Sequence, residues 1–246
     1  MPRKPDCVSF QRVLVALELS QHSVAAAPFA IELARLYGPN VSVALMLPKN
    51  WRPDVHSALT ETVRKSLAQD DVPNEVAIDR STIAQQFPAI VKSVGAEIVV
   101  LCVQSAVGLD KVFHGSWAQE ITCSVGVPVV SIGKSARGLP HLRSVLYVTD
   151  FSPASEHAFV YAQSLAKRFA AKLICLHVND GTDEPAAMAE QKLFEFLRDR
   201  VDELEIGTLD LDRDVLVRFG AQANEILSVA GDRDADLIVV GLKCKQ

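Results

Sequence analysis

One short motif in the sequence has the residue types of a phosphate-binding loop. Gly133-Lys134-Ser135 matches the end of a P-loop, in which backbone N–H groups, a lysine and a hydroxyl bind phosphate and its metal ion. A P-loop also needs a glycine five residues earlier, where Pro128 stands, and a helix directly afterwards, where Gly138 and Pro140 intervene. The spacing therefore excludes a P-loop at this position.

The histidines and cysteines have no spacing that is typical of a metal or nucleophile site. The sequence contains no HExxH pair, no CxxC pair and no GxSxG elbow. His177, within the apolar run Leu176-His177-Val178, is interpreted as a residue at the end of a strand and not as a base. We therefore predict no catalytic constellation, and no metal other than magnesium accompanying a nucleotide.

The composition is that of an acidic globular protein. The 246 residues are 49% hydrophobic and 22% charged, which is typical of a folded chain and not of a disordered one. The formal net charge of −5 provides no basic surface for a nucleic acid. The first residues, Met1–Arg12, contain no apolar signal region, and no apolar run approaches the roughly 20 residues that span a bilayer. A cytoplasmic protein without nucleic-acid or membrane partners is expected.

Short apolar runs alternate with amphipathic segments along the chain. This alternation predicts an α/β fold, in which an open parallel sheet carries helices on both faces. Strands are expected at 13–17, 41–47, 75–78, 97–103 and 127–132, and helices at 20–37, 54–69, 83–94, 116–124 and 190–204.

The pattern of the first half begins again in the second half. The run Val13–Ser20 reappears as Val145–Ser152, 132 positions later, and Ala96–Val100 reappears as Ala235–Val239, 139 positions later. Two copies of one domain explain this repeat, and a drift of seven residues is ordinary loop variation. We predict a first domain at 8–134, a linker at 135–142 that is rich in small and helix-breaking residues, and a second domain at 143–246. The second copy is expected to be truncated, without a last helix and strand.

The second copy carries a resemblance to a known family. Its opening segment Val145–Ser152, the run Leu173–Val178, and the later segments Val217–Gly220 and Ala235–Gly241 resemble, in order and spacing, the universal stress protein family. The resemblance extends more weakly to the first copy. It implies two tandem Rossmann-like domains of the adenine nucleotide alpha hydrolase-like type.

The resemblance also implies a nucleotide site at the carboxyl ends of the strands. In family members that bind ATP, an aspartate at the end of the first strand faces the nucleoside, and Asp150 occupies that position here, with Glu18 as its counterpart in the first copy. Two alternatives remain open for Asp150, which can instead form a turn or cap the next helix. A structural role is favoured for Glu18, because its extra methylene displaces the carboxylate. The adenosine half of a site is expected around Asp150 and Val178.

The phosphate loop of the family has the pattern Gly, two residues, Gly, nine residues, then Gly followed by Ser or Thr. The glycines let the backbone approach a phosphate, and amides at the next helix bind it. In the first copy the pattern falls on Cys102, Ser105 and Gly115-Ser116, so both leading glycines are replaced and a structural role for Gly115-Ser116 is favoured. In the second copy Gly241 matches the first glycine and Cys244 replaces the second.

We therefore predict a non-catalytic regulator or binding module of the universal stress type, which binds ATP or another adenine nucleotide. An ATP-hydrolysing or adenylate-handling enzyme is the first alternative, and a nucleotide-free interaction scaffold is the second. The two domains are expected to form an intramolecular pseudo-dimer, or the chain to form a homodimer through 127–132.

Overall fold

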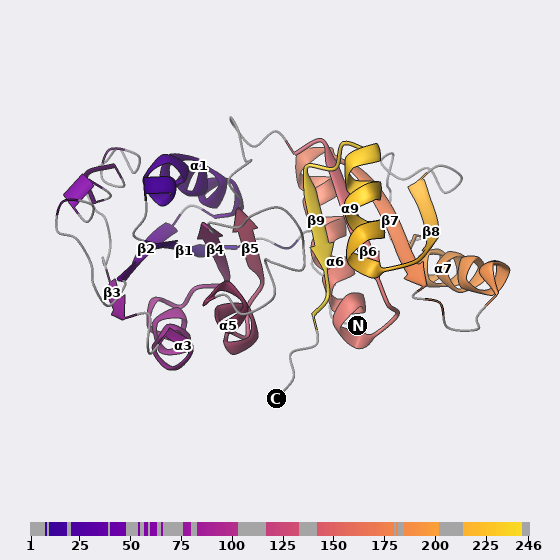
Figure 1. Cartoon of the computed structure of the whole chain (residues 1–246), viewed down its shortest axis with the longest axis horizontal. Helices are drawn as coiled ribbons and strands as arrows, with labels where there is room; N and C mark the ends of the chain where they lie inside the picture. Colours follow the sequence, from indigo (N-terminus) through magenta and orange to yellow (C-terminus); the bar gives the residue numbers. More distant parts are fainter. Residues whose placement is uncertain are drawn as a thin grey trace. The chain divides into compact units, whose positions relative to one another are not determined.

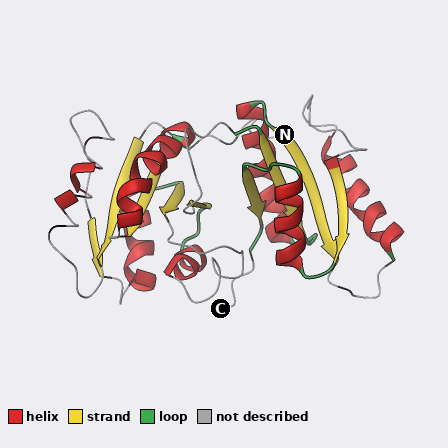
Figure 2. Ribbon diagram, turned by 45° about the horizontal axis from the view of Figure 1, so that its top comes forward, coloured by secondary structure: helices red, strands yellow, loops and turns green. Residues whose placement is uncertain are grey.

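The computed structural model describes residues 8, 10–18, 21–38, 40–47, 76–79, 83–102, 117–132, 142–179, 181, 185–201 and 214–242, with single helical positions between 54 and 65. The chain divides into two compact units, one of Ser9–Pro140 and the other of His141–Gln246 together with Met1–Val8. Helices cover both faces of the sheet in each unit (Figure 2).

The first unit is built on a parallel sheet with the strand order β3-β2-β1-β4-β5 (Figure 1). Helix α1 (Gln21–Tyr37) lies on one side of this sheet, and α3 (Ile83–Val94) and α5 (Trp117–Ser124) lie on the other. Both faces of this sheet are apolar. Because helices cover both sides, consecutive side chains along each strand are buried. The strands are β1 (Arg12–Glu18), β2 (Asn40–Leu47), β3 (Val76–Asp79), β4 (Ile98–Cys102) and β5 (Val129–Ile132).

The second unit has a parallel sheet with the order β8-β7-β6-β9 among its described residues. Helix α6 (Pro153–Phe169) and helix α7 (Ala186–Val201) contribute to one core on one side of the sheet, and α9 (Gln222–Asp232) covers the other side. The strands are β6 (Ser144–Thr149), β7 (Lys172–Asn179), β8 (Val215–Phe219) and β9 (Leu237–Val240).

The same strand register occurs in both sheets. In the first unit Val13 of β1 pairs with Val41 and Ile98. In the second unit Val145 of β6 pairs with Leu173 and Leu237, which lie 132 and 139 positions after those partners. These are the two spacings of the sequence repeat, so the predicted fold of two tandem Rossmann-like domains is confirmed.

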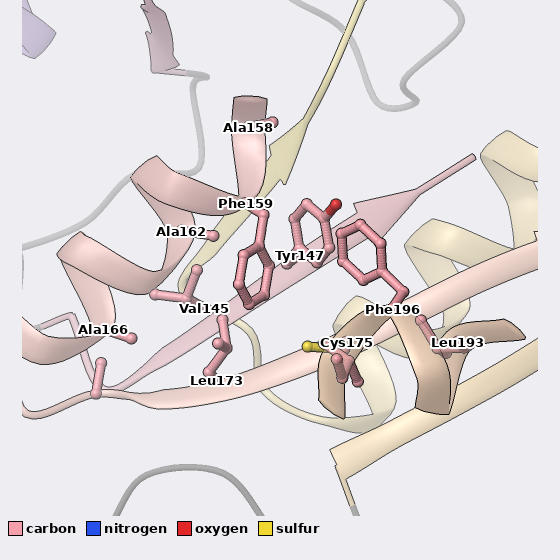
Figure 3. Packing of buried hydrophobic residues seen from close by; sticks show 12 residues of the cluster. Val145, Tyr147, Ala158, Phe159, Ala162, Ala166, Leu173, Cys175, Leu193 and Phe196 are labelled. Atoms are coloured by element: carbon pink, nitrogen blue, oxygen red, sulfur yellow. The ribbon is translucent and has the colours of Figure 1, made fainter. Parts of the chain in front are cut away.

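The core of the second unit is aromatic (Figure 3). The ring of Tyr147 packs edge-on against Phe159, with the centroids 5.0 Å apart, and lies nearly parallel to Phe196 at 6.3 Å. The Tyr147 hydroxyl donates a hydrogen bond to the Ser155 carbonyl at 2.8 Å. Burial of the ring against these apolar neighbours raises the pKa of Tyr147 to about 12. The hydrogen bond satisfies the one polar group that this ring brings into the core.

The strands next to the first strand differ in burial between the units. All five residues of β4 are buried, because α3 and α5 supply Phe87, Val91 and Ile121 to the same core and β5 pairs along its outer edge. All residues of β9 are only partly buried, and in the described part of the second unit no strand pairs with its outer edge.

Most sequence-based boundaries agree with the structure within two residues, and the helix expected at 83–94 has these limits. The described positions between 54 and 65 are helical, as expected, whereas α7 begins four residues before the expected position 190. None of the helices in the described ranges combines the length and apolar character that crossing a membrane requires.

Candidate functional site

The carboxyl ends of the four strands in the second unit lie along one edge of its sheet, because all of them run parallel. Asp150 directly follows β6, Asn179 ends β7, Gly220 follows β8 and Gly241 follows β9. Open parallel sheets bind their ligands at this edge. The predicted residues Asp150, Val178 and Gly241 therefore lie at or directly after the strand ends that define this edge.

Asp150 shapes the turn between β6 and α6. The Ser152 N–H donates to the Asp150 Oδ1 at 3.0 Å, which closes a short turn around Phe151. Phe151 has a φ of 58°, in the left-handed region that a non-glycine residue adopts at a cost of about 1 kcal/mol or more. Ser152 is the N-cap of α6, since its side chain accepts from the Ser155 N–H at 3.4 Å. Of the two structural roles predicted for Asp150, it has the first, since it forms the turn. The second role, capping the helix, belongs to Ser152.

The turn between β6 and α6 is held by a network of hydrogen bonds around Thr149. The Phe151 N–H donates to Thr149 Oγ1 at 3.0 Å, and Thr149 Oγ1 lies 3.1 Å from Ser155 Oγ. His177 Nδ1 lies 2.8 Å from the Thr149 carbonyl oxygen, and the His177 and Phe151 rings have centroids 4.5 Å apart. His177 is buried at the end of β7, which confirms its interpretation as a strand-end residue. The contact between His177 and Thr149 was not predicted from the sequence.

Asn179 is a second residue that the sequence analysis missed. Its Oδ1 accepts from the Gly181 N–H at 3.1 Å, and its carbonyl accepts from the Gly220 N–H at 3.0 Å. It is buried, and it links the ends of β7 and β8 beside Val178, which is also buried. A polar residue at the end of an apolar run was the signal that could have identified it.

Gly241 has a packing reason to be glycine. A Cβ atom at this position would lie 2.3 Å from the Ala154 carbonyl carbon and 2.4 Å from the Ser155 nitrogen. The end of β9 therefore lies against the first turn of α6, where backbone amides begin the helix. A side chain at Gly241 would separate these two elements, so the residue brings the β9 end to the same place as Asp150.

The first unit differs at the equivalent positions. Glu18 is the last residue of β1, as expected, and Cys102 is the last residue of β4. Burial raises the pKa of the Cys102 thiol to about 12, so this residue is a packed apolar group. Ser105, Gly115 and Ser116 lie outside the described residues, as does Cys244. In the ranges that the structure describes, no group of three metal-ligating side chains forms a site.

Comparisons with known proteins agree with this architecture. No curated protein matches the sequence significantly. Residues 141–243 match the model of the universal stress protein family. A universal stress protein from Archaeoglobus fulgidus DSM 4304 is 16% identical with a TM-score of 0.62, and the match covers 92% of this chain and 83% of that one.

Two further solved structures were matched. A protein of Pseudomonas aeruginosa UCBPP-PA14 that is assigned to the universal stress proteins is 18% identical with a TM-score of 0.60, over 93% of this chain and 81% of that one. A universal stress protein in complex with cAMP is 16% identical with a TM-score of 0.40, over 52% of this chain and 100% of that one. The similarity to the universal stress protein family thus covers residues 141–243, and the preceding unit has the same parallel α/β fold.

Proposed function

We propose that the universal stress protein domain of this chain binds an adenine nucleotide at the carboxyl edge of β6, β7 and β9, and that it acts as a non-catalytic regulatory module. The observation that carries the proposal is the convergence of Asp150 and Gly241 at the start of α6. Asp150 is exposed and directly follows β6, the position at which the resemblance to the family implies an aspartate that faces the nucleoside.

The chemistry of this edge favours the adenosine part of the ligand. The carboxylate of Asp150 can accept hydrogen bonds from hydroxyl groups. The backbone at Val178 and Asn179 forms the neighbouring strand end, next to the β6–α6 turn. The first amides of α6 and the helix dipole favour an anion near Ser152. Of the leading glycines with which the family's loop approaches a triphosphate, the second unit keeps Gly241 and has Cys244 in place of the other. A nucleoside monophosphate therefore fits the residues better than ATP.

Two other functions were considered for this chain, an ATP-hydrolysing or adenylate-handling enzyme and a nucleotide-free scaffold. An ATP-hydrolysing enzyme needs a positioned base or metal ligand, and the buried His177 is instead used inside the fold. A nucleotide-free scaffold remains the second alternative, and only a binding measurement separates it from the proposal.

Calorimetric titration of the full chain with AMP and with ATP tests the proposal. We expect saturable binding of AMP that is at least as tight as binding of ATP. Asp150→Ala should abolish this binding, whereas Asp150→Asn keeps an oxygen acceptor for the Ser152 N–H and should retain the turn while weakening AMP binding at least tenfold.

Absence of binding by the wild-type chain at millimolar nucleotide would favour the scaffold. Release of phosphate from ATP that depends on Asp150 would favour the enzyme. A titration that Asp150→Ala leaves unchanged would place the nucleotide elsewhere on the chain.

A further inference from the structure

The two units differ in what lies beneath the turn that follows their first strand. In the second unit β6 and β7 pair Thr149 with His177. In the first unit the same register pairs Leu17 with Leu45, which lie 132 positions earlier. Both leucines are almost completely buried, as are Thr149 and His177. One unit thus has a polar pair at a site where its counterpart has an apolar pair.

Burying this polar pair is costly unless its hydrogen bonds are made. The structure shows where they are made. The Thr149 carbonyl only accepts, so His177 Nδ1 carries the proton in their contact of 2.8 Å. Thr149 Oγ1 accepts from the Phe151 N–H at 3.0 Å, and it also lies 3.1 Å from Ser155 Oγ.

All of these contacts fix the three residues around Asp150. The backbone before Asp150 is held at the Thr149 carbonyl, and the backbone after it is held at the Phe151 N–H. The Phe151 ring packs at a tilt against the His177 ring, with the centroids 4.5 Å apart, and its centroid lies 6.0 Å from that of Phe196. These contacts offset the strain of the left-handed conformation at Phe151.

We propose that His177 is a positioning residue for Asp150, and that this polar network restricts nucleotide binding to the second unit. This inference rests on the proposed function for its binding readout. His177 acts through the Thr149 carbonyl and the Phe151 ring, and it needs no contact with the ligand. In the first unit the paired positions are Leu17 and Leu45, and their apolar side chains cannot form these hydrogen bonds next to Glu18.

The test replaces His177 by the residue that the first unit uses at the same place. His177→Leu introduces an apolar side chain of similar volume and removes the donor to the Thr149 carbonyl. We expect its Kd for AMP to rise at least tenfold by calorimetry. His177→Asn places an amide donor where Nδ1 lies, so its Kd should return to within about threefold of the wild-type value.

A matched control separates positioning from general destabilisation. Leu173→Ala removes a fully buried side chain from the opposite end of the same strand. It should lower the unfolding midpoint in urea at least as much as His177→Leu does, and leave the Kd for AMP unchanged.

Hydrogen exchange, followed by NMR, gives a readout that does not depend on any ligand. In His177→Leu the Phe151 and Ser152 amides should exchange at least tenfold faster, while amides in the middle of α6 keep their rates. If wild-type chain binds no nucleotide and these amides still respond, the proposed function fails and the positioning role stands. Unchanged exchange at both amides, or equal loss of AMP affinity in His177→Leu, His177→Asn and Leu173→Ala, would overturn the inference.

Discussion

Single residues at the β6–α6 turn combine structural and chemical roles. The Asp150 carboxylate accepts from the Ser152 N–H through Oδ1, and the residue is nevertheless exposed to solvent. The carboxylate can therefore hold the turn and still be accessible to a ligand from the solvent side. A turn-forming role and a binding role for Asp150 do not exclude each other.

Two buried cysteines are predicted to be chemically inert in the folded protein. Cys102 and Cys175 are free and buried, and burial raises the pKa of both thiols, to about 12 for Cys102. Because the thiolate is the reactive form, iodoacetamide at pH 8 should label neither residue in the native state and both in 8 M urea, on the timescale of minutes. Mass spectrometry of the peptides that contain them measures this directly. Labelling of either cysteine in native protein at its rate in urea would contradict the burial.

The sequence permits prediction of Asp150 and Gly241 because each belongs to a local pattern of strand, turn and helix. It does not permit prediction of the Thr149–His177 contact, which joins residues 28 positions apart and depends on the register between β6 and β7. The close approach of Gly241 to Ala154 is hidden for the same reason. Contacts between segments that are distant in the sequence can be predicted only once the strand order and register are known.

At the level of elements, the helices and strands follow closely from the periodicity of the sequence. Alternating short apolar runs and amphipathic segments are the strongest local signal for parallel α/β units. How deeply a strand is buried is harder to predict from this periodicity. The strands β4 and β9 have nearly the same apolar sequence, yet β4 is fully buried and β9 is not, because only β4 has a paired outer neighbour among the described residues.

Two glycines provide a matched test of how α9, β9 and α6 are joined. Gly241→Ala introduces a Cβ atom 2.3 Å from the backbone of Ala154, and it should lower the free energy of unfolding by about 3 kcal/mol. Gly231→Ala lies in α9, where an added Cβ meets no atom within 4 Å, and it should raise this free energy by up to about 1 kcal/mol. Urea titration followed by circular dichroism measures both. Equal effects of the two substitutions would mean that β9 does not end against α6.

On the scale of the whole molecule, the repeat is conserved in its architecture and altered in its chemistry. Both units keep the order of the first four strands and the same register. The core under α6 in the second unit contains Tyr147, Phe159 and Phe196, and the positions 132 residues before the first two are occupied by Val15 and Ala27. A sequence repeat therefore predicts a shared fold, and the residues that break the repeat indicate where the units have diverged.

This divergence leads to a prediction about alkaline pH. Tyr147 has an ordinary pKa of 10.0 and a pKa of about 12 in the folded protein, because its ionised form cannot be hydrated in the core. The folded pKa is raised, so the associated stability is complete below pH 10 and is lost as the pH rises towards 12. Over that interval the free energy of unfolding should fall by about 1.4 kcal/mol per pH unit on account of this residue.

Tyr147→Phe isolates this contribution. The substitution removes the hydrogen bond to the Ser155 carbonyl, so its stability at pH 8 should be about 1 kcal/mol lower than that of the wild type. Between pH 10 and 12 the difference between the two proteins should shrink and then reverse, because phenylalanine has no proton to lose. Urea titrations at pH 8, 10 and 11 measure this difference, and the other groups that titrate there contribute equally to both proteins. A difference that stays constant across this range would mean that Tyr147 ionises as readily in the folded state as in the unfolded state, which its place between Phe159 and Phe196 forbids.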